Sequence, residues 1–485
     1  MKSFNLSCIF IFISSVINAQ EKLGITNSNY SSTNSIFLNP SSSVDSRTYM
    51  QFNLVGLNVY GMTNLAYIPA FSVWSYAKTQ QIQDYQVSQL KLKKFALGVA
   101  SVEGPAFVIS KGNYGAGIFF RGRSVGEVKR VPYELVNLVL SPDTNLAKDY
   151  FSDLNLRNVI FNSMSWVEGG VNFGAMVRKH KMSLWTFGGN LRYIIGVKIN
   201  YGRLQQLKTT IEPTKMEVEK LRGQLRYNDG GFNSGRGAGM DLGFTYKKML
   251  EVVERYYANS TLSGCKHIDY KYKIGVSLRD LGFIRFKKNT TTADINTSGT
   301  FKIDTVTRQI DLRGGLTENF AIEEKHNPIL ATLPTALSVQ VDWNFGNNFY
   351  VNGTVVKNIV PNAFVGVQGS NLISICPRYE VRQFEVAMPL TFQKFIYPQL
   401  GFAFRIRTFV LGFDNVFPLI FKKKTYGLNI YMNIGFSRFR NRACDQKVRR
   451  VDDCGPKEYR KKKRQARKLA PPKKRDFSKP RKIRK

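Results

Sequence analysis

The feature that most constrains the fold is a two-residue alternation of apolar and polar side chains, repeated over runs of about ten residues. In residues 167–177 the odd positions are mostly apolar and the even positions small or polar, and residues 185–195 repeat the pattern after a basic turn. Because successive side chains of a strand point to opposite faces, each run predicts a strand with one apolar and one polar face. Further runs cover residues 240–246, 274–279, 337–345, 400–407 and 426–436.

These runs do not suit a soluble β-sandwich. Sandwich strands have about 5–6 residues, whereas strands that cross a membrane need about 9–11. A bilayer offers no partner to backbone polar groups, so membrane strands must close into a barrel. The sequence therefore predicts an all-β fold, a transmembrane antiparallel β-barrel of about 14 strands over residues 47–437. Its inward, polar face would carry four arginines, Arg192, Arg279, Arg405 and Arg407.

The same alternation predicts which side chains meet lipid. Phe187 is in the apolar set and Asn190 in the polar set of one run. An arginine at Phe187 is expected to cost about 2–4 kcal/mol, as cations at the bilayer midplane do. An arginine at Asn190 is expected to be tolerated, because it would point into the lumen.

Long polar stretches separate the alternating runs. Outer-membrane barrels join their strands by short turns in the periplasm and longer loops outside, so we expect loops in these stretches. Residues 211–226 also permit a short helix, in which Met216, Val218 and Leu221 would share a face. The stretches lie at roughly 75–94, 126–160, 203–235, 249–268 and 285–332.

The N-terminus predicts export. Lys2 precedes an apolar stretch centred on residues 9–13, and small and polar residues lead to Ala19. This is the pattern of a secretory signal peptide over residues 1–19. The apolar stretch is shorter than the about 20 residues that a membrane-spanning helix needs. We therefore expect an outer-membrane protein in contact with lipid.

The C-terminal end is strongly basic. The whole chain has a formal charge of +37, and residues 438–485 hold 22 lysines and arginines against five acidic residues. In a cytosolic protein such a tail would suggest nucleic-acid binding, but an exported chain meets no genome. We expect a disordered periplasmic tail that docks on an envelope protein, on lipid or on peptidoglycan. The candidate docking residues are Lys461, Lys462, Lys463, Arg464, Lys473, Lys474 and Arg475.

Four cysteines follow the signal peptide and allow three disulfide connectivities. The favoured bond joins Cys444 to Cys454, which lie ten residues apart beside a Gly-Pro turn, and a bond between Cys265 and Cys376 would be compatible with it. No CxxC motif occurs, and no histidine stands at an informative spacing from a nucleophile. We therefore expect no metal, no cofactor and no catalytic site.

Specific residues resemble a known superfamily. Residues 31–42, SSTNSIFLNPSS, look like the Asn-Pro-Ala segment that precedes the first strand in FadL-like long-chain fatty-acid transporters and PorV-like barrels of type IX secretion. Residues 272–282 resemble a strand of uncharacterised Bacteroidota barrels of that superfamily. The resemblance covers residues 24–436 and implies that residues 20–46 fold into the lumen as a hatch carrying Asn39 and Pro40. Ser41 departs from the family's alanine, and Asn-Pro is also a good turn former.

Two functions fit these observations. The first is an accessory or scaffold subunit of an envelope machine, such as type IX secretion or barrel assembly, and the basic tail favours it because a pore gains nothing from such a tail. The alternative is an outer-membrane transporter or porin for hydrophobic or anionic small solutes, with the lumen arginines setting selectivity. Stable protein partners in a pull-down would indicate the scaffold, and measurable conductance the transporter.

Overall fold

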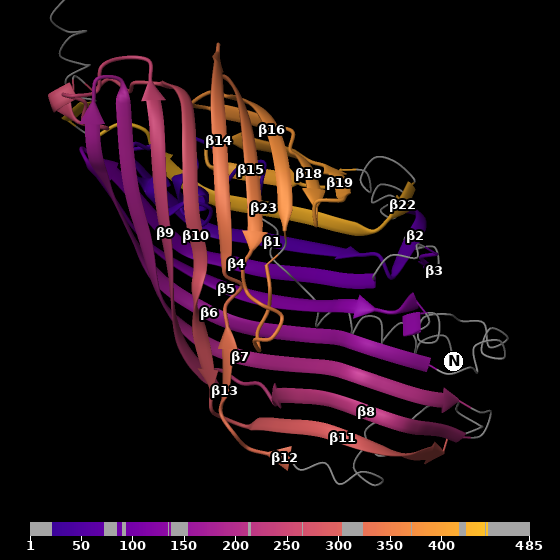
Figure 1. Ribbon diagram of the computed structural model, residues 1–485. Helices are drawn as coiled ribbons and strands as arrows, with labels where there is room; N and C mark the ends of the chain where they lie inside the picture. Colours follow the sequence, from indigo (N-terminus) through magenta and orange to yellow (C-terminus); the bar gives the residue numbers. More distant parts are fainter. Residues whose placement is uncertain are drawn as a thin grey trace, which may run out of the picture.

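The computed structural model describes residues 22–71, 85–89, 94–133, 135–136, 154–211, 215–263, 265–302, 324–369, 371–416, 423–441 and 443–444. Almost all of its regular structure is antiparallel β (Figure 1). The helical elements are α2 (Ser32–Ser35), η1 (Pro40–Ser43) and η2 (Thr261–Ser263). The signal peptide and the seven tail residues Lys461 to Arg475 expected to dock lie outside the described residues.

The strands are β1 (Met50–Thr63), β2 (Ala66–Phe71), β3 (Gln86–Val87), β4 (Lys94–Lys111), β5 (Tyr114–Val131), β6 (Leu154–His180), β7 (Ser183–Ile211), β8 (Lys215–Asn228), β9 (Gly235–Met249), β10 (Tyr270–Phe286), β11 (Thr290–Lys302), β12 (Glu324–Lys325), β13 (Ile329–Thr332), β14 (Ala336–Gly346), β15 (Phe349–Asn358), β16 (Leu372–Glu380), β17 (Phe384–Ala387), β18 (Leu390–Gln393), β19 (Tyr397–Leu400), β20 (Phe402–Ile406), β21 (Phe409–Phe413), β22 (Lys423–Thr425) and β23 (Gly427–Arg438).

The strands close into a ring. Around it run β1, β4, β5, β6, β7, β9, β10, β14, β15 and β16, each paired antiparallel with the next. β17 and β18 then form one interrupted strand of the wall, β19 and β20 the next, and β21 leads to β23. β23 pairs back with β1, which closes the sheet. The predicted barrel of about 14 strands is confirmed, with 14 positions in its wall.

The outer face of the wall is apolar, as a bilayer requires. Phe187 and Leu191 of β7 are 44% and 63% exposed, while Asn190 between them is fully buried. β14 alternates in the same way along most of its length. Aromatic rings pair across neighbouring strands near one end of the barrel, as in Trp185 with Tyr246. The predicted orientation of these strands is therefore confirmed. Among the described residues, no helix has the length and apolar character needed to cross a membrane.

The two ends of the barrel differ. At the short-turn end, β6 and β7 or β14 and β15 are joined by two residues, and both the start of β1 and the end of β23 lie there. At the other end, β5, β6 and β7 continue past the barrel and form a projecting sheet with β8 and β11 (Figure 1). We call this the extension end. The described parts of residues 126–160, 203–235 and 285–332 are thus largely strand rather than loop. The helix considered for residues 211–226 is wrong, because β8 pairs with β7 and β11 there.

The disulfide also differs from the expected one. Cys444 is bonded to Cys265, with their Cα atoms 5.6 Å apart, so it is not paired with Cys454, which lies outside the described residues. Cys376 is a free, buried thiol, so the second expected pair is wrong as well. The physical reason is that the chain leaves β23 at the short-turn end, where the β9–β10 connection also lies. Proximity across the barrel mouth decides the pairing, rather than proximity in sequence.

Candidate functional site

The lumen holds residues 22–49, which we call the N-terminal segment. Most of its side chains are buried, although many are serine, threonine or asparagine. Many of their polar groups bond to inward-facing residues of the wall, which offsets much of the cost of burying them. Its partners lie on almost every side of the ring: Glu103 of β4, Asn172 of β6, Asn190 of β7, Lys247 of β9, Ser277 of β10, Gln340 of β14, Thr354 of β15, Glu380 of β16, Glu385 of β17 and Asn433 of β23.

Lys22 is the first described residue of the N-terminal segment and is deeply buried. Its Nζ lies 2.6 Å from Glu103 Oε2 and donates to Asn34 Oδ1 at 3.1 Å and Asn433 Oδ1 at 2.9 Å. A buried ammonium needs such partners because an unpaired one would be strongly unfavourable. These contacts therefore anchor the segment to β4 and to β23, the two strands that flank β1.

Asn39 and Pro40 start the short helix η1. The Asn39 carbonyl oxygen Oδ1 accepts from Ser41 N at 3.1 Å, and Pro40 stands at the first helical position, where it loses no hydrogen bond. The Asn39 Nδ2 group donates to Gln340 Oε1 at 3.0 Å and to Thr245 Oγ1 at 3.2 Å. Both predicted hatch residues therefore lie inside the barrel, against β9 and β14.

Glycines make room for η1 on the wall. Gly115 of β5, Gly174 of β6, Gly188 of β7 and Gly243 of β9 are direct cross-strand neighbours, and we call them the glycine row. A Cβ on Gly188 would stand 2.6 Å from Ser41 Cα, and each of the others would meet residues 39–44 at 2.1–2.5 Å. No side chain fits there while the N-terminal segment is in place. The wall and the segment are shaped to each other.

A charged layer lies next to the glycine row, toward the extension end. Arg192 of β7 lies 2.7 Å from Asp280 Oδ1 and 2.5 Å from Asp241 Oδ1, and all three side chains are buried. Asp280 reaches this position through a register shift in β10 between Leu278 and Leu281, where its φ is +53°. The layer's other members are Arg121 and Arg123 of β5 and Glu168 of β6.

An apolar cluster lies beyond the charged layer, toward the extension end. Trp166 of β6 and Ile194 of β7 are buried in it, and the Trp166 indole donates to Glu168 at 3.1 Å, joining the two layers. Barrel interiors are usually polar, so this inward apolar packing is a distinct feature. Its other members are Val99, Val125, Met164, Ile199, Ile284, Phe286, Ile329, Ala331, Leu333 and Val367.

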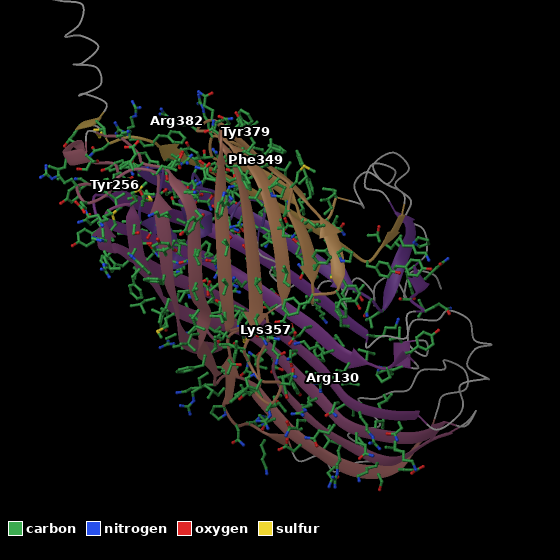
Figure 2. The ribbon with its side chains drawn as sticks, turned by 45° about the horizontal axis from the view of Figure 1, so that its top comes forward. Arg130, Tyr256, Phe349, Lys357, Tyr379 and Arg382 are labelled. Atoms are coloured by element: carbon green, nitrogen blue, oxygen red, sulfur yellow. A yellow bond between two sulfur atoms is a disulfide. The ribbon has the colours of Figure 1, made fainter. Side chains whose placement is uncertain are left out.

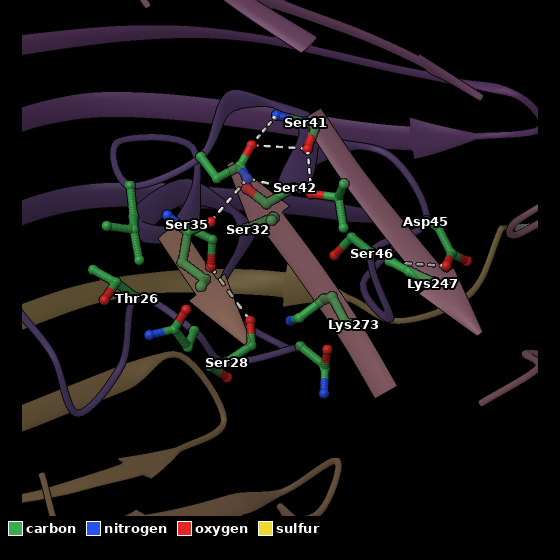
Figure 3. Close-up of a pocket in the computed structure, with 17 residues that line it drawn as sticks. Thr26, Ser28, Ser32, Ser35, Ser41, Ser42, Asp45, Ser46, Lys247 and Lys273 are labelled. Carbon is green, nitrogen blue, oxygen red and sulfur yellow. Dashed lines mark hydrogen bonds and ion pairs between the residues drawn. The ribbon is translucent and has the colours of Figure 1, made fainter. Parts of the chain in front are cut away.

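The space between the N-terminal segment and strands β9 and β10 is small. The cavity there has a volume of about 50 Å³. Serines and asparagines of the segment line it together with Lys247 and Lys273 of the wall (Figure 3). Both amines are paired, Lys247 with Asp45 at 2.8 Å and Lys273 with Asp342 at 3.1 Å. A cavity of this size holds only a few water molecules.

The four arginines expected to form a lumen cluster are not together. Arg192 lies in the charged layer, and Arg279 is buried in β10. Arg405 is buried nearer the short-turn end and pairs with Glu385 at 2.9 Å. Arg407 is exposed with φ +55°, so its placement in the lumen is wrong. The reason is that β20 ends at Ile406, so the alternation stops one residue earlier than expected.

Sequence reasoning missed the acidic partners of these arginines. Glu168 and Asp241 stand at inward positions of the alternating runs, and that signal was sufficient to place them in the lumen. Asp280 gave no such signal, because the register shift in β10 reverses the phase there. Within the described residues, no group of three or more histidine, cysteine or acidic side chains has a geometry that would hold a metal ion.

Comparisons with known proteins add the family. No curated protein matches the sequence. The Pseudomonas putida toluene transporter TodX is 9% identical with a TM-score of 0.38, over 84% of this chain and 94% of that one. A TodX deltaS2S3 mutant described as a monoaromatic hydrocarbon channel is 11% identical with a TM-score of 0.40, over 88% and 98%. A Pseudomonas aeruginosa FadL homologue is 8% identical with a TM-score of 0.23, over 87% and 97%. A family model matches residues 40–414, and the chain therefore belongs to the family of unknown function DUF5723.

Proposed function

We propose that this chain is an outer-membrane transporter for small hydrophobic solutes, in which the N-terminal segment is a hatch that closes the lumen and moves to let solute pass. The observation that carries the proposal is the fit of η1 against the glycine row. A residue with a side chain at any of these wall positions would displace Ser41 or its neighbours. A segment that only preceded the first strand would not need a matching row on four successive strands.

A movable hatch is consistent with the contacts that hold the segment. They are mainly hydrogen bonds between side chains, together with ion pairs of Lys22 with Glu103, of Asp45 with Lys247, and of Arg47 with Asp269 and Glu380. Each hydrogen bond contributes only about 0.5–1.5 kcal/mol net, because water replaces it when the segment leaves. The wall strands, in contrast, are joined by continuous backbone ladders. The segment therefore separates from the wall more easily than the wall strands separate from one another.

The solute class follows from the lumen's charge and polarity. Arg192 faces Asp241 and Asp280, and Arg405 faces Glu385, so these arginines are neutralised. This favours a weakly polar or hydrophobic solute over an anion. The inward apolar cluster around Trp166 and Ile194 supports the same choice, since the side chains packed toward the extension end of the lumen are apolar.

A lock on the hatch tests the proposal. Ser41 Oγ lies 2.7 Å from Thr245 Oγ1, so the pair Ser41→Cys/Thr245→Cys places two thiols in reach of each other. The variant would be oxidised, reconstituted in vesicles and assayed for uptake of a small aromatic fluorophore. We expect uptake by the wild type and by each single variant, and its loss in the oxidised double variant. Uptake by the wild type no faster than by protein-free vesicles would refute transport, and undiminished uptake by the locked variant would refute a moving hatch.

A scaffold role in type IX secretion or barrel assembly stays a prediction. It draws on the basic tail, whose docking residues lie outside the described part of the chain. The structure adds one observation in its favour, because β23 ends at the short-turn end, the end expected to face the periplasm. Envelope protein partners or peptidoglycan retained with the full chain would support this role.

A further inference from the structure

Two segments cross the mouth of the barrel at the short-turn end, and we call them together the mouth strap. The first is the connection between β9 and β10, residues 250–263 and 265–269. Its Val253 N donates to the Lys181 carbonyl in the β6–β7 turn at 2.7 Å. Farther along, Gly112 N in the β4–β5 turn donates to the Ala258 carbonyl at 2.7 Å, and Ala258 N donates back at 3.1 Å. This connection therefore spans the mouth from β9 to β4.

The second part of the mouth strap is the chain after β23, residues 439–441 and 443–444. The Phe439 ring packs edge-on against the Tyr30 ring, with centroids 6.0 Å apart, and the Arg382 guanidinium stacks over Phe439 at 4.5 Å. Arg382 and Tyr256 mark this end of the barrel in Figure 2. In the ring order, β23 stands opposite β9 and β10. The Cys265–Cys444 bond thus joins strap parts that start on opposite sides of the mouth.

The mouth strap lies against the N-terminal segment. The Tyr256 hydroxyl donates to Asp45 Oδ1 at 2.6 Å, and Asn259 Nδ2 donates to the Ser46 carbonyl at 3.1 Å. Tyr30 touches the other part of the strap through Phe439. On its opposite side the segment faces the charged layer and the apolar cluster. The strap therefore contacts the segment from the side of the short-turn end.

We propose that the Cys265–Cys444 disulfide is a thiol-controlled clasp: while it is intact, the mouth strap retains the N-terminal segment, and its reduction by a dithiol protein frees the segment to leave through the short-turn end. The inference rests on the proposed hatch and adds its regulation. Without the bond, the residues after β23 are held to the rest of the strap only by non-covalent contacts. The disulfide therefore adds a covalent link between two parts of the strap that are otherwise held by non-covalent contacts.

The chemistry needs one reductant, a protein with two thiols. Its thiolate attacks the sulfur of Cys265, because Cys265 is a partly exposed residue while Cys444 is 1% exposed. A mixed disulfide forms and Cys444 leaves as a thiolate, which takes up a proton. The donor's second thiol then displaces Cys265, so the donor ends as a disulfide and both cysteines of this chain end as thiols. Two electrons and two protons pass in total. The periplasm, where this end is expected to lie, supports both the formation and the exchange of disulfides.

Hydrogen exchange of the full chain in lipid vesicles tests the clasp without any solute. Peptides covering residues 22–49 would be compared between the oxidised protein and the same protein treated with dithiothreitol. We expect exchange in this segment to become at least about tenfold faster on reduction, while β14 and β15 keep their protection, because local opening is separate from global unfolding. Equal exchange in both states would overturn the proposal. Loss of protection in β14 and β15 together with the segment would also overturn it, since the bond would then stabilise the barrel as a whole.

Cysteine variants distinguish the effect of reducing the Cys265–Cys444 disulfide from any effect of the free thiol. Cys265→Ser/Cys444→Ser is expected to exchange like the reduced wild type, with or without dithiothreitol. Cys376→Ser removes the buried free thiol and is the matched control, expected to respond to dithiothreitol as the wild type does. A clasp that responds while vesicles show no solute uptake would leave the clasp standing and refute the transporter. Solute uptake without any change in the exchange of the N-terminal segment on reduction would support the transporter and refute the clasp.

Discussion

Arg378 and Asp342 form a forked ion pair inside the barrel, with nitrogen–oxygen distances of 2.9 and 2.7 Å and side chains no more than 1% exposed. Arg378 Nε also bonds Glu380 at 3.1 Å. Arg378→Met would leave two buried carboxylates short of a cation, and breaking such a pair costs about 3–5 kcal/mol. Urea titration in lipid vesicles would measure the free energy of unfolding. Arg378→Lys, which keeps the charge but not the fork, is expected to lose less, and a Met variant as stable as the wild type would contradict the prediction.

The attachment of the N-terminal segment is expected to weaken in acid. The pKa of His267 is lowered, because partial burial of its side chain, which is 31% exposed, outweighs the attraction of the Asp45 carboxylate. Burial alone would raise the pKa of Asp45, but Lys247 and His267 more than offset it, so that pKa is lowered. Both groups therefore bind fewer protons in the folded state, and the stability they contribute is lost as pH falls. The stability that His267 contributes is lost below its ordinary pKa of about 6.5, and the stability that Asp45 contributes is lost only below about pH 4.

Thermal unfolding between pH 8 and pH 5 checks this expectation. The midpoint should fall with pH in the wild type and change less in His267→Gln. His180→Gln removes an exposed histidine and is the matched control, expected to follow the wild type. A pH dependence that is unchanged in His267→Gln would contradict the role given to His267, which faces Asp45, Arg47, Lys247 and Asp269.

Phe187 lies on the lipid face, so Phe187→Arg should destabilise the barrel by about 2–4 kcal/mol. Phe187→Leu, which keeps an apolar side chain there, is expected to stay near the wild type in a refolding titration. The structure changes the expectation for Asn190. Its Nδ2 donates to the Ile36 carbonyl at 3.0 Å and to Asp241 at 2.8 Å, so arginine there would displace the N-terminal segment. Full tolerance of Asn190→Arg would show that the lumen is open at this level.

Truncation after Cys454 tests the tail. We expect the shortened chain still to insert, because every strand of the barrel ends by Arg438. We also expect loss of co-purifying envelope proteins or of peptidoglycan retention, since most of the basic residues beyond β23 are removed. A truncated chain that keeps all its partners would leave the tail without a docking role.

The two-residue alternation was enough to predict the barrel, its strand number and the lipid-facing set. Phe187 and Leu191 illustrate why, since burial in a closed barrel follows the same period as the strand itself. Strand β8 was not predictable, because its polar sequence becomes a strand only through pairing with β7 and β11 outside the bilayer. The Cys265–Cys444 bond was hidden for a similar reason, as the two cysteines are 179 residues apart and meet only when the ring closes.

The role of the wall glycines was the feature of the candidate site that was hardest to predict from the sequence. Gly188 and Gly243 stand at inward positions of alternating runs, where glycine is ordinary in a strand that packs closely. Only the position of η1 gives the glycine row its meaning. The Asn39-Pro40 pair was identified from sequence, but its partners Gln340 and Thr245 come from strands far along the chain.

Conductance in planar lipid bilayers would show whether the N-terminal segment closes the lumen. Gly188→Val places a side chain where Cβ would stand 2.6 Å from the Ser41 backbone, whereas at Gly353 the nearest atom to a Cβ is 3.9 Å away. We expect Gly188→Val to conduct several times more than the wild type, because its side chain would displace the hatch from the lumen, and Gly353→Val to conduct like the wild type. Equal, near-zero conductance of all three proteins, each shown to be folded, would contradict this expectation.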